Sequence, residues 1–228
     1  MYIKYCIESC LNQKNFSDYE IIVIDDGSTD NTVEIVGRYI NKIRFYQIKN
    51  SGIEVASNLG ISKSNGEFIV RIDADDKIHE EYLKETVSIL EFNKHCDFVY
   101  SNYYVIDEKD QIKNTMFLPK FEQKEIKKRG DFLATGTLFR KKALFNVGLY
   151  SESVKNCGLE SYELILKLLD NGSKGILLEK PLFYYRRHHK NLSIENINSI
   201  IAYGNKIAVK YGIEKYSTNK YHPFGLKI

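Results

Sequence analysis

Short apolar runs that alternate with segments of helical periodicity constrain the fold of this chain more than any other feature. The runs at residues 19–24, 43–48 and 67–72 have the length and the β-branched or aromatic content of buried strands. Between them, apolar side chains recur at helical spacing in residues 33–39 and 54–64. Strands that alternate with helices of this length indicate βαβ units. We therefore expect an α/β fold with a mostly parallel central sheet that is flanked by helices.

The rest of the chain predicts further elements on the same grounds. The predicted helices cover residues 3–13, 80–92, 160–169 and 194–211, and the predicted strands cover residues 98–103 and 175–185, the latter as one strand or two. Residues 107–110 predict a hairpin turn, residues 117–128 a charged connection with little periodicity, and residues 132–150 a short strand and a short helix. We expect one domain over residues 1–190, followed by a C-terminal helix and tail over residues 191–228.

Composition bears on partners and on cellular location. The 33 basic and 30 acidic residues leave a net charge of +3, which gives no electrostatic reason to expect nucleic acid as a partner. Four cysteines, at positions 6, 10, 96 and 157, show neither zinc-site spacing nor the density of a disulfide scaffold. No apolar run approaches the roughly 18 residues of a membrane-spanning helix. We expect a cytoplasmic protein, and peripheral contact with the inner face of the membrane stays open.

Three carboxylates in four positions, Asp73, Asp75 and Asp76, follow the strand predicted at residues 67–72. Clustered carboxylates repel one another unless a positive charge lies among them. Oxygen ligands favour a hard cation such as Mg²⁺ or Mn²⁺, which keeps open positions for substrate phosphates. The alternative interpretation is a solvated acidic turn that begins the next helix, where negative charge is favourable.

A second acidic pair, Asp25 and Asp26, follows the strand predicted at residues 19–24. In an open parallel sheet, ligands bind beyond the carboxyl ends of the strands, so both acidic clusters belong at the same edge. A metal-phosphate site beside a carboxylate that accepts hydrogen bonds from a base or ribose would suit a nucleotide diphosphate. The two clusters together favour the metal site over the acidic turn.

Several short motifs, in this order along the chain, resemble the family 2 glycosyltransferases, which have the GT-A fold. They lie at residues 7–13 (IESCLNQ), 25–32 (DDGSTDNT), 58–61 (NLGI), 66–67 (GE), 73–76 (DADD), 136–141 (GTLFRK), 148–150 (GLY) and 185–188 (YRRH). The resemblance implies an enzyme that moves a sugar from a nucleotide-diphosphate sugar, with a UDP-sugar as the expected donor. It implies a saccharide or lipid-linked acceptor, and inversion at the sugar.

The resemblance also implies roles for the acidic residues. Asp26 would contact the nucleotide base and Asp25 would support its loop, while Asp73 and Asp75 would be the outer members of a DxD element that addresses ribose and diphosphate. The implied ligands of Mn²⁺ or Mg²⁺ are Asp75, Asp76 and His188. For His188 an ordinary surface histidine at a strand end is an equal alternative.

The chain departs from the family pattern in three places. The resemblance implies a buried strand before residue 3 that this sequence does not contain, so we expect either a truncated gene product or another segment or chain in that place. Position 57 is Ser where the family often has Arg, which weakens the hold on phosphate. Position 161 is Ser where the family commonly has an Asp that deprotonates the acceptor.

A hydroxyl cannot accept a proton as a carboxylate does, so the catalytic base would be Glu160 or Glu163, or it would be missing. Glu160 is the better placed of the two, with a solvated carboxylate at a helix N-terminus as the alternative. Three functions therefore stay open. They are a metal-dependent glycosyltransferase, a catalytically impaired relative that binds nucleotide or serves as a partner subunit, and a phosphotransferase. The last fits least well because the chain has no GxxxxGK[ST] loop.

Overall fold

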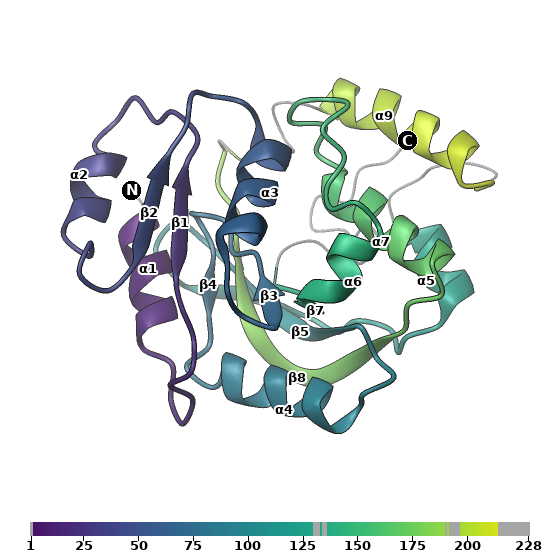
Figure 1. Ribbon diagram of the computed structural model, residues 1–228, viewed down its shortest axis with the longest axis horizontal. Coiled ribbons are helices and arrows are strands. Elements are labelled where there is room, and N and C mark those ends of the chain that lie inside the picture. Colours follow the sequence, from purple (N-terminus) through teal and green to yellow (C-terminus); the bar gives the residue numbers. More distant parts are fainter. Residues whose placement is uncertain (1, 130–132, 134–135, 190, 192–196, 214–228) are drawn as a thin grey trace.

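The computed structural model describes residues 2–129, 133, 136–189, 191 and 197–213. Its first part is a small parallel sheet of two strands, β1 (Ile22–Asp25) and β2 (Arg44–Gln47). Helices α1 (Ile3–Leu11) and α2 (Thr32–Gly37) pack together through buried apolar side chains, and α3 (Ile53–Lys63) packs on β1. Figure 1 shows these elements gathered on the left side of the molecule.

A second sheet of six strands forms the centre of the molecule. Its members are β3 (Phe68–Val70), β4 (Lys77–Ile78), β5 (Phe98–Ile106), β6 (Ile112–Met116), β7 (Leu138–Arg140) and β8 (Gly175–Arg186). They lie in the order β3, β7, β5, β8 and β4, with β6 beside β5. The long strands β5 and β8 run side by side through the middle of Figure 1.

The α/β class with a central sheet and flanking helices is as predicted, but the strand directions are mixed. Among the described residues, the pairs β1–β2 and β5–β8 are parallel, and the other four pairs are antiparallel. The expectation of a mostly parallel sheet therefore holds for two pairs only. The hairpin predicted at residues 107–110 is present and joins β5 to β6 as antiparallel neighbours.

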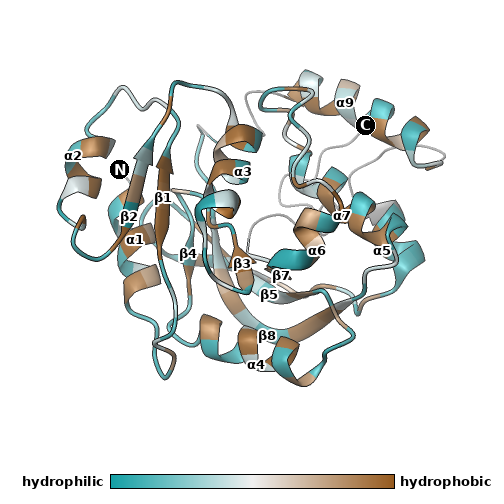
Figure 2. Cartoon of the chain, viewed as in Figure 1, coloured by the Kyte–Doolittle hydropathy of each residue, from teal (hydrophilic) through white to brown (hydrophobic). Residues whose placement is uncertain are grey.

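The other helices of the described residues are α4 (Tyr82–Phe92), α5 (Gln123–Arg129), α6 (Lys141–Asn146), α7 (Glu160–Asp170) and α9 (Ile197–Lys210), of which α9 packs on α7. Helix α4 packs against β5 and β8, while α7 buries Leu164, Ile165 and Leu168 in the main core. Apolar strands and mixed outer helices are visible in Figure 2, in which β1 and β8 are hydrophobic. No helix among the described residues has both the length and the apolar character needed to cross a membrane.

Two elements differ from the sequence expectations. Residues 117–128 were expected to be a connection without periodicity, yet α5 forms there because Ile126 is completely buried under α7. The two-residue strand β4 was not expected, and it exists because β8 supplies its antiparallel partner. The predicted helix at residues 194–211 corresponds to α9, although residues 194–196 and most of the predicted tail lie outside the described residues.

The two sheets do not pair with each other. Among the described residues, β1 pairs with β2 alone and β3 pairs with β7 alone. The apolar side chains of both strands are only half-buried, and they line one cavity of about 1670 Å³ together with residues of α1 and α3. The acidic residues that follow β1 and β3 line the same cavity, so the carboxyl ends of these two strands share one edge.

Helix α9 is held on α7 by a buried carboxylate. Glu163 is only 3% exposed, and its oxygens accept hydrogen bonds from the Tyr203 hydroxyl at 2.6 Å and the Lys210 ammonium at 2.8 Å. Leu166 of α7 and Ile200 of α9 meet in the same apolar cluster. Because a buried charge is tolerated only when it is paired, Glu163 is bound in its ionised form.

We expect Glu163→Gln to lower the unfolding free energy at pH 7 by about 1–2 kcal/mol, because a charge-assisted hydrogen bond is lost. Burial raises the pKa of Glu163, but hydrogen bonds from Lys210 and Tyr203 outweigh burial and place that pKa below the usual 4.5. A lowered pKa stabilises the folded state above pH 4.5, and this contribution disappears as the pH falls through the folded-state pKa. The variant should therefore lose less stability than the wild type on acidification.

Urea unfolding from about pH 6 down to pH 3 measures both effects. The matched control is Glu34→Gln, because Glu34 is an exposed helical carboxylate that pairs with Arg38. Equal pH profiles for the wild type and Glu163→Gln would contradict the assignment.

Candidate functional site

Asp25 is the last residue of β1 and shapes the loop between β1 and α2. Asp25 is buried, and its carboxylate accepts hydrogen bonds from the Ser28 N–H at 3.0 Å and the Gln47 amide at 3.2 Å. Burial raises the pKa of Asp25, but these bonds outweigh it and leave the pKa below its ordinary value. This geometry is the one expected of a residue that supports the loop.

Asp26 binds the chain just before α3. Its two oxygens accept the backbone N–H groups of Ser51 at 2.6 Å and Gly52 at 2.8 Å. Asp26 also lines the cavity. The expected contact with a nucleotide base stays a prediction, and the structure adds a second task, which is to hold the N-terminus of α3.

Arg71 joins the DxD element to α7. Its guanidinium lies 3.1 Å from an oxygen of Asp73 and 3.0 Å from an oxygen of Glu160, and it also packs over the ring of Tyr150 at 5.4 Å. Burial raises the pKa of Asp73 to about 6, because the charges of Asp75 and Glu160 add to burial and Arg71 opposes them only in part. A single cation therefore serves two carboxylates here.

Sequence reasoning did not single out Arg71. The available signal was its position, because Arg71 is a charged residue within the apolar run that leads into the DxD element. Such a side chain must find partners when the strand is covered, and the nearest carboxylate is two residues away. Only the fold shows that the second partner is Glu160, 89 positions later in the chain.

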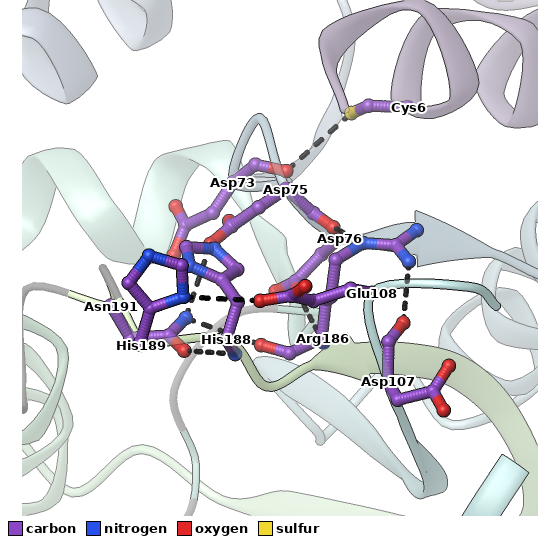
Figure 3. Close-up of polar contacts among 10 residues, drawn as sticks. All are labelled: Cys6, Asp73, Asp75, Asp76, Asp107, Glu108, Arg186, His188, His189 and Asn191. Carbon is purple, nitrogen blue, oxygen red and sulfur yellow. Dashed lines mark hydrogen bonds and ion pairs between the residues drawn. The ribbon is translucent and has the colours of Figure 1, made fainter. Parts of the chain in front are cut away.

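The end of β8 brings His188 to Asp75. The His188 ring nitrogen Nε2 lies 3.0 Å from Asp75 Oδ2, and the Asn191 amide donates to the same oxygen at 3.2 Å. Figure 3 shows these three side chains converging. Asn191 was not predicted, although it follows His188 by three residues in the sequence.

Asp76 is fixed from the same side. It is 1% exposed, and its Oδ1 accepts the backbone N–H of Arg186 at 2.8 Å. The Arg186 guanidinium in turn donates to the backbone carbonyl of Asp75 at 2.7 Å, as Figure 3 shows. Of the three predicted metal ligands, the structure brings His188 to Asp75, whereas the Asp76 carboxylate is held by the Arg186 N–H. Among the described residues the three do not form a group with ligand-like spacing, so their role as metal ligands stays a prediction.

The chemistry of Asp75 and His188 suits a divalent cation, and their contact distance is one at which both could bind the same ion. Two ligand atoms at right angles on one ion, each about 2.1 Å from it, lie about 3 Å apart. The 3.0 Å between Asp75 Oδ2 and His188 Nε2 matches this separation. Carboxylate ligands suit both Mg²⁺ and Mn²⁺, and an imidazole ligand suits the transition metal better.

Within the described part of the chain, three buried residues between α3 and α7 do have ligand-like spacing. One ligand atom from each of Glu54, Cys157 and Glu160 lies within 4.8 Å of the others, and all three residues are buried. The Glu54 oxygens already accept two backbone N–H groups, and burial raises the pKa of the Cys157 thiol far above its ordinary value. A neutral thiol is a poor ligand for a hard cation.

The two candidate bases are separated by the fold. Glu160 begins α7, lines the cavity and contacts Arg71, and its Oε2 has no hydrogen-bond partner within the described part of the chain. Glu163 points instead to α9, where Tyr203 and Lys210 bind it. The structure therefore brings Glu160 to Asp73 and does not bring Glu163 there.

Comparison with known proteins adds an independent line of argument. The profile of the family described as "Glycosyl transferase family 2" matches residues 1–149. The glycosyltransferase GlyG of Streptococcus pneumoniae serotype 4 is 39% identical over 113 residues, which cover 48% of this chain and 37% of GlyG. The chain thus matches well under half the length of this relative.

Two solved structures share the fold. TarS residues 1–349 of S. aureus, in complex with UDP-GlcNAc, superposes with a TM-score of 0.74 at 22% identity, over 92% of this chain and 62% of that one. The mannosyltransferase PcManGT of Pyrobaculum calidifontis, in complex with GDP-Man and Mn²⁺, gives a TM-score of 0.67 at 16% identity, over 98% and 64%. At these identities the comparison shows the fold alone.

Replacing Arg71 tests the contact that joins the two halves of the site. We expect Arg71→Met to lower the unfolding free energy by about 3 kcal/mol, because it leaves two carboxylates without their cation. Arg71→Lys should recover part of the lost stability. The lysine ammonium can pair with one carboxylate, but it lacks the planar fork with which arginine binds two. Urea unfolding at neutral pH measures the change.

The control is Arg38→Met, which removes an exposed i,i+4 pair with Glu34 and should change stability by less than about 0.5 kcal/mol. An Arg71→Met variant as stable as this control would show that the buried contacts have no net stabilising effect.

Proposed function

Because the chain belongs to glycosyl transferase family 2, we propose that it transfers a sugar from a nucleotide-diphosphate sugar, with inversion, to a saccharide or lipid-linked acceptor. One observation supports this most. Asp26, Asp75 and Glu160 come from three distant parts of the sequence, and they line one cavity at the shared edge of two sheets. A lipid-linked acceptor would bring the protein to a membrane surface, as the sequence left open.

The donor half is the edge formed by the ends of β1, β3 and β8. Asp75, Asp76 and His188 would hold Mn²⁺ or Mg²⁺, and a metal bound there supplies Lewis-acid neutralisation of a leaving diphosphate. Asp76 is oriented by the Arg186 N–H and Asp75 by Asn191, so both carboxylates are positioned before ligand binds. The GDP-Man and Mn²⁺ in PcManGT and the UDP-GlcNAc in TarS support a ligand of this class.

The nucleotide would lie against the loop after β1. Asp25 keeps this loop in shape through Ser28 and Gln47. Each carboxylate oxygen of Asp26 accepts one backbone N–H, and an ionised carboxylate has further lone pairs for a base N–H. Asp73, two residues before Asp75, would accept from ribose or lie beside the diphosphate. A UDP-sugar is the expected donor.

The acceptor half depends on Glu160. Inversion by direct displacement requires a base that takes the proton of the acceptor hydroxyl while its oxygen bonds to the sugar and the nucleoside diphosphate leaves. Glu160 Oε2 is buried without a hydrogen-bond partner among the described residues, whereas Oε1 is held by Arg71. Glu160 is therefore our candidate base, and the hydroxyl of Ser161 cannot replace it.

One observation favours a second candidate function. The guanidinium of Arg71 contacts Glu160 Oε1 at 3.0 Å, so one oxygen of the candidate base already has a partner. Together with Ser161 in place of an Asp, this would suit a relative that binds nucleotide with little or no turnover, alone or as a partner subunit. Binding and turnover must therefore be measured separately.

Metal-dependent binding of UDP tests the donor half. We expect calorimetry to detect UDP binding in Mn²⁺ and to lose it after chelation, because the diphosphate needs the cation. Asp76→Asn should weaken binding by about tenfold or more, since one charged ligand is lost. Equal UDP affinity with and without metal would contradict the assignment of Asp75, Asp76 and His188, and Glu34→Asn serves as the exposed control.

Turnover tests the acceptor half. With Mn²⁺ and a panel of UDP-, GDP- and dTDP-sugars, we expect hydrolysis or transfer with at least one donor. Glu160→Gln should lower kcat by at least about 100-fold while UDP affinity is kept, because only the base is lost. A folded protein that binds UDP with metal and turns over no donor would support the second candidate function instead.

A further inference from the structure

Residues 50–54, at the start of α3, lie between the donor half and the loop that precedes Glu160. On one side, the N–H groups of Ser51 and Gly52 donate to Asp26, as described above. On the other side, the Asn50 carbonyl accepts a hydrogen bond from the Lys155 ammonium at 2.8 Å. This short segment therefore touches both parts of the site.

Glu54 makes the strongest contact with the second side. Its side chain is buried, and its two oxygens accept the backbone N–H groups of Asn156 and Cys157, both at 3.0 Å. The contact is reciprocal, because Asn156 Oδ1 accepts the Ile53 N–H at 3.0 Å. Hydrogen bonds to a charged acceptor are stronger than neutral ones, and two of the three bonds here have the Glu54 carboxylate as acceptor. All three join segments about 100 positions apart.

The backbone in this region leaves little space. Gly52 has a φ of +104°, and a Cβ added there would lie 2.7 Å from Lys155 Cγ and 3.0 Å from a Glu54 oxygen. Asn156 also has a positive φ, of 52°. Two adjoining turns are thus held in uncommon conformations by contacts with each other.

Glu160 lies three residues after Cys157, at the first position of α7. One ligand atom each of Glu54, Cys157 and Glu160 lies within 4.8 Å of the others, so the carboxylate held by Arg71 is next to the loop held by Glu54. Movement of residues 156–157 would move the start of α7. Arg71 holds only one oxygen of the Glu160 side chain, so the backbone of residues 156–157 contributes to where that side chain lies.

We propose that Glu54 is a positioning residue for Glu160, and that it acts by holding residues 156–157, which precede α7. The inference rests on the proposed function, because it concerns the reaction in which Glu160 accepts the proton. Glu54 itself does not touch the reacting atoms; it acts through the backbone of Asn156 and Cys157.

Steady-state kinetics of Glu54→Gln provides the first test. A glutamine oxygen accepts one N–H, and its NH₂ group faces the other, so one of two charge-assisted bonds is lost. We expect kcat to fall about tenfold while the donor KM and the UDP affinity stay within about twofold, because the donor half is intact. A change in stability alone would lower the active fraction and leave the pH dependence of kcat unchanged, whereas a displaced base should change that pH profile.

The matched control is Glu152→Gln. Glu152 is an exposed carboxylate of the same loop, and it accepts a side-chain hydrogen bond from Asn58 at 2.7 Å. We expect wild-type kcat in this variant. Wild-type kcat and pH profile in Glu54→Gln would overturn the inference while leaving the proposed function in place.

Thiol labelling tests the contact between Glu54 and residues 156–157 without any need for turnover. Cys157 is 1% exposed beneath the Glu54 contact, and Cys96 is 4% exposed in a different apolar cluster. Labelling with N-ethylmaleimide, followed by mass spectrometry of each cysteine peptide, should show Cys157 reacting at least about tenfold faster in Glu54→Ala, with Cys96 unchanged.

The two assays separate the possible failures. A wild type that binds UDP and turns over no donor counts against the proposed function, and labelling still decides whether Glu54 holds the loop. If Cys157 is labelled at the wild-type rate in both Glu54→Gln and Glu54→Ala, Glu54 does not hold the loop and the inference is overturned. If the labelling rate of Cys96 rises as much as that of Cys157 in both variants, the variants unfold globally, and a local role of Glu54 is overturned as well.

Discussion

The paired contacts of Arg71 hold the candidate site together. Arg71 directly follows β3, and its guanidinium lies within hydrogen-bond distance of two carboxylates. One is Asp73 in the loop after β3, and the other is Glu160 at the start of α7. A buried cation without partners costs several kcal/mol, so the fold is stable only when α7 places its first residue against β3. The position of the candidate base follows from this requirement.

Two further contacts also connect distant segments at the site. In each of them a carboxylate accepts backbone N–H groups from a segment far away in the sequence. Asp76 accepts the Arg186 N–H at the end of β8, and Glu54 accepts two N–H groups from the loop before α7. Such bonds orient a carboxylate before any ligand arrives, which is the property that a site for diphosphate and metal requires. They also leave His188 beside Asp75, where a third ligand is needed.

Much of the secondary structure was predictable from local pattern, and the exceptions have a common cause. The helix at residues 160–169 and the strand at residues 98–103 carry strong periodicity and are present as α7 and β5. Helix α5 was missed because its sequence is mostly charged and a single apolar contact, Ile126, holds it in place. The antiparallel pairs were missed because the direction of a strand depends on how the chain returns to the sheet.

By itself, the sequence determined that apolar strands alternate with helices, that acidic clusters follow two of those strands, and that the order of the motifs is that of a glycosyltransferase family. Periodicity and motif order are properties of the sequence itself, so they can be recognised without the tertiary structure. Only the tertiary structure decided between Glu160 and Glu163, which lie one helical turn apart and have the same side chain. Glu160 contacts Arg71 at the cavity, whereas Glu163 is bound by Tyr203 and Lys210 of α9. The physical reason is that the environment of a buried carboxylate is set by partners far away in the sequence, which no spacing rule along one helix can specify.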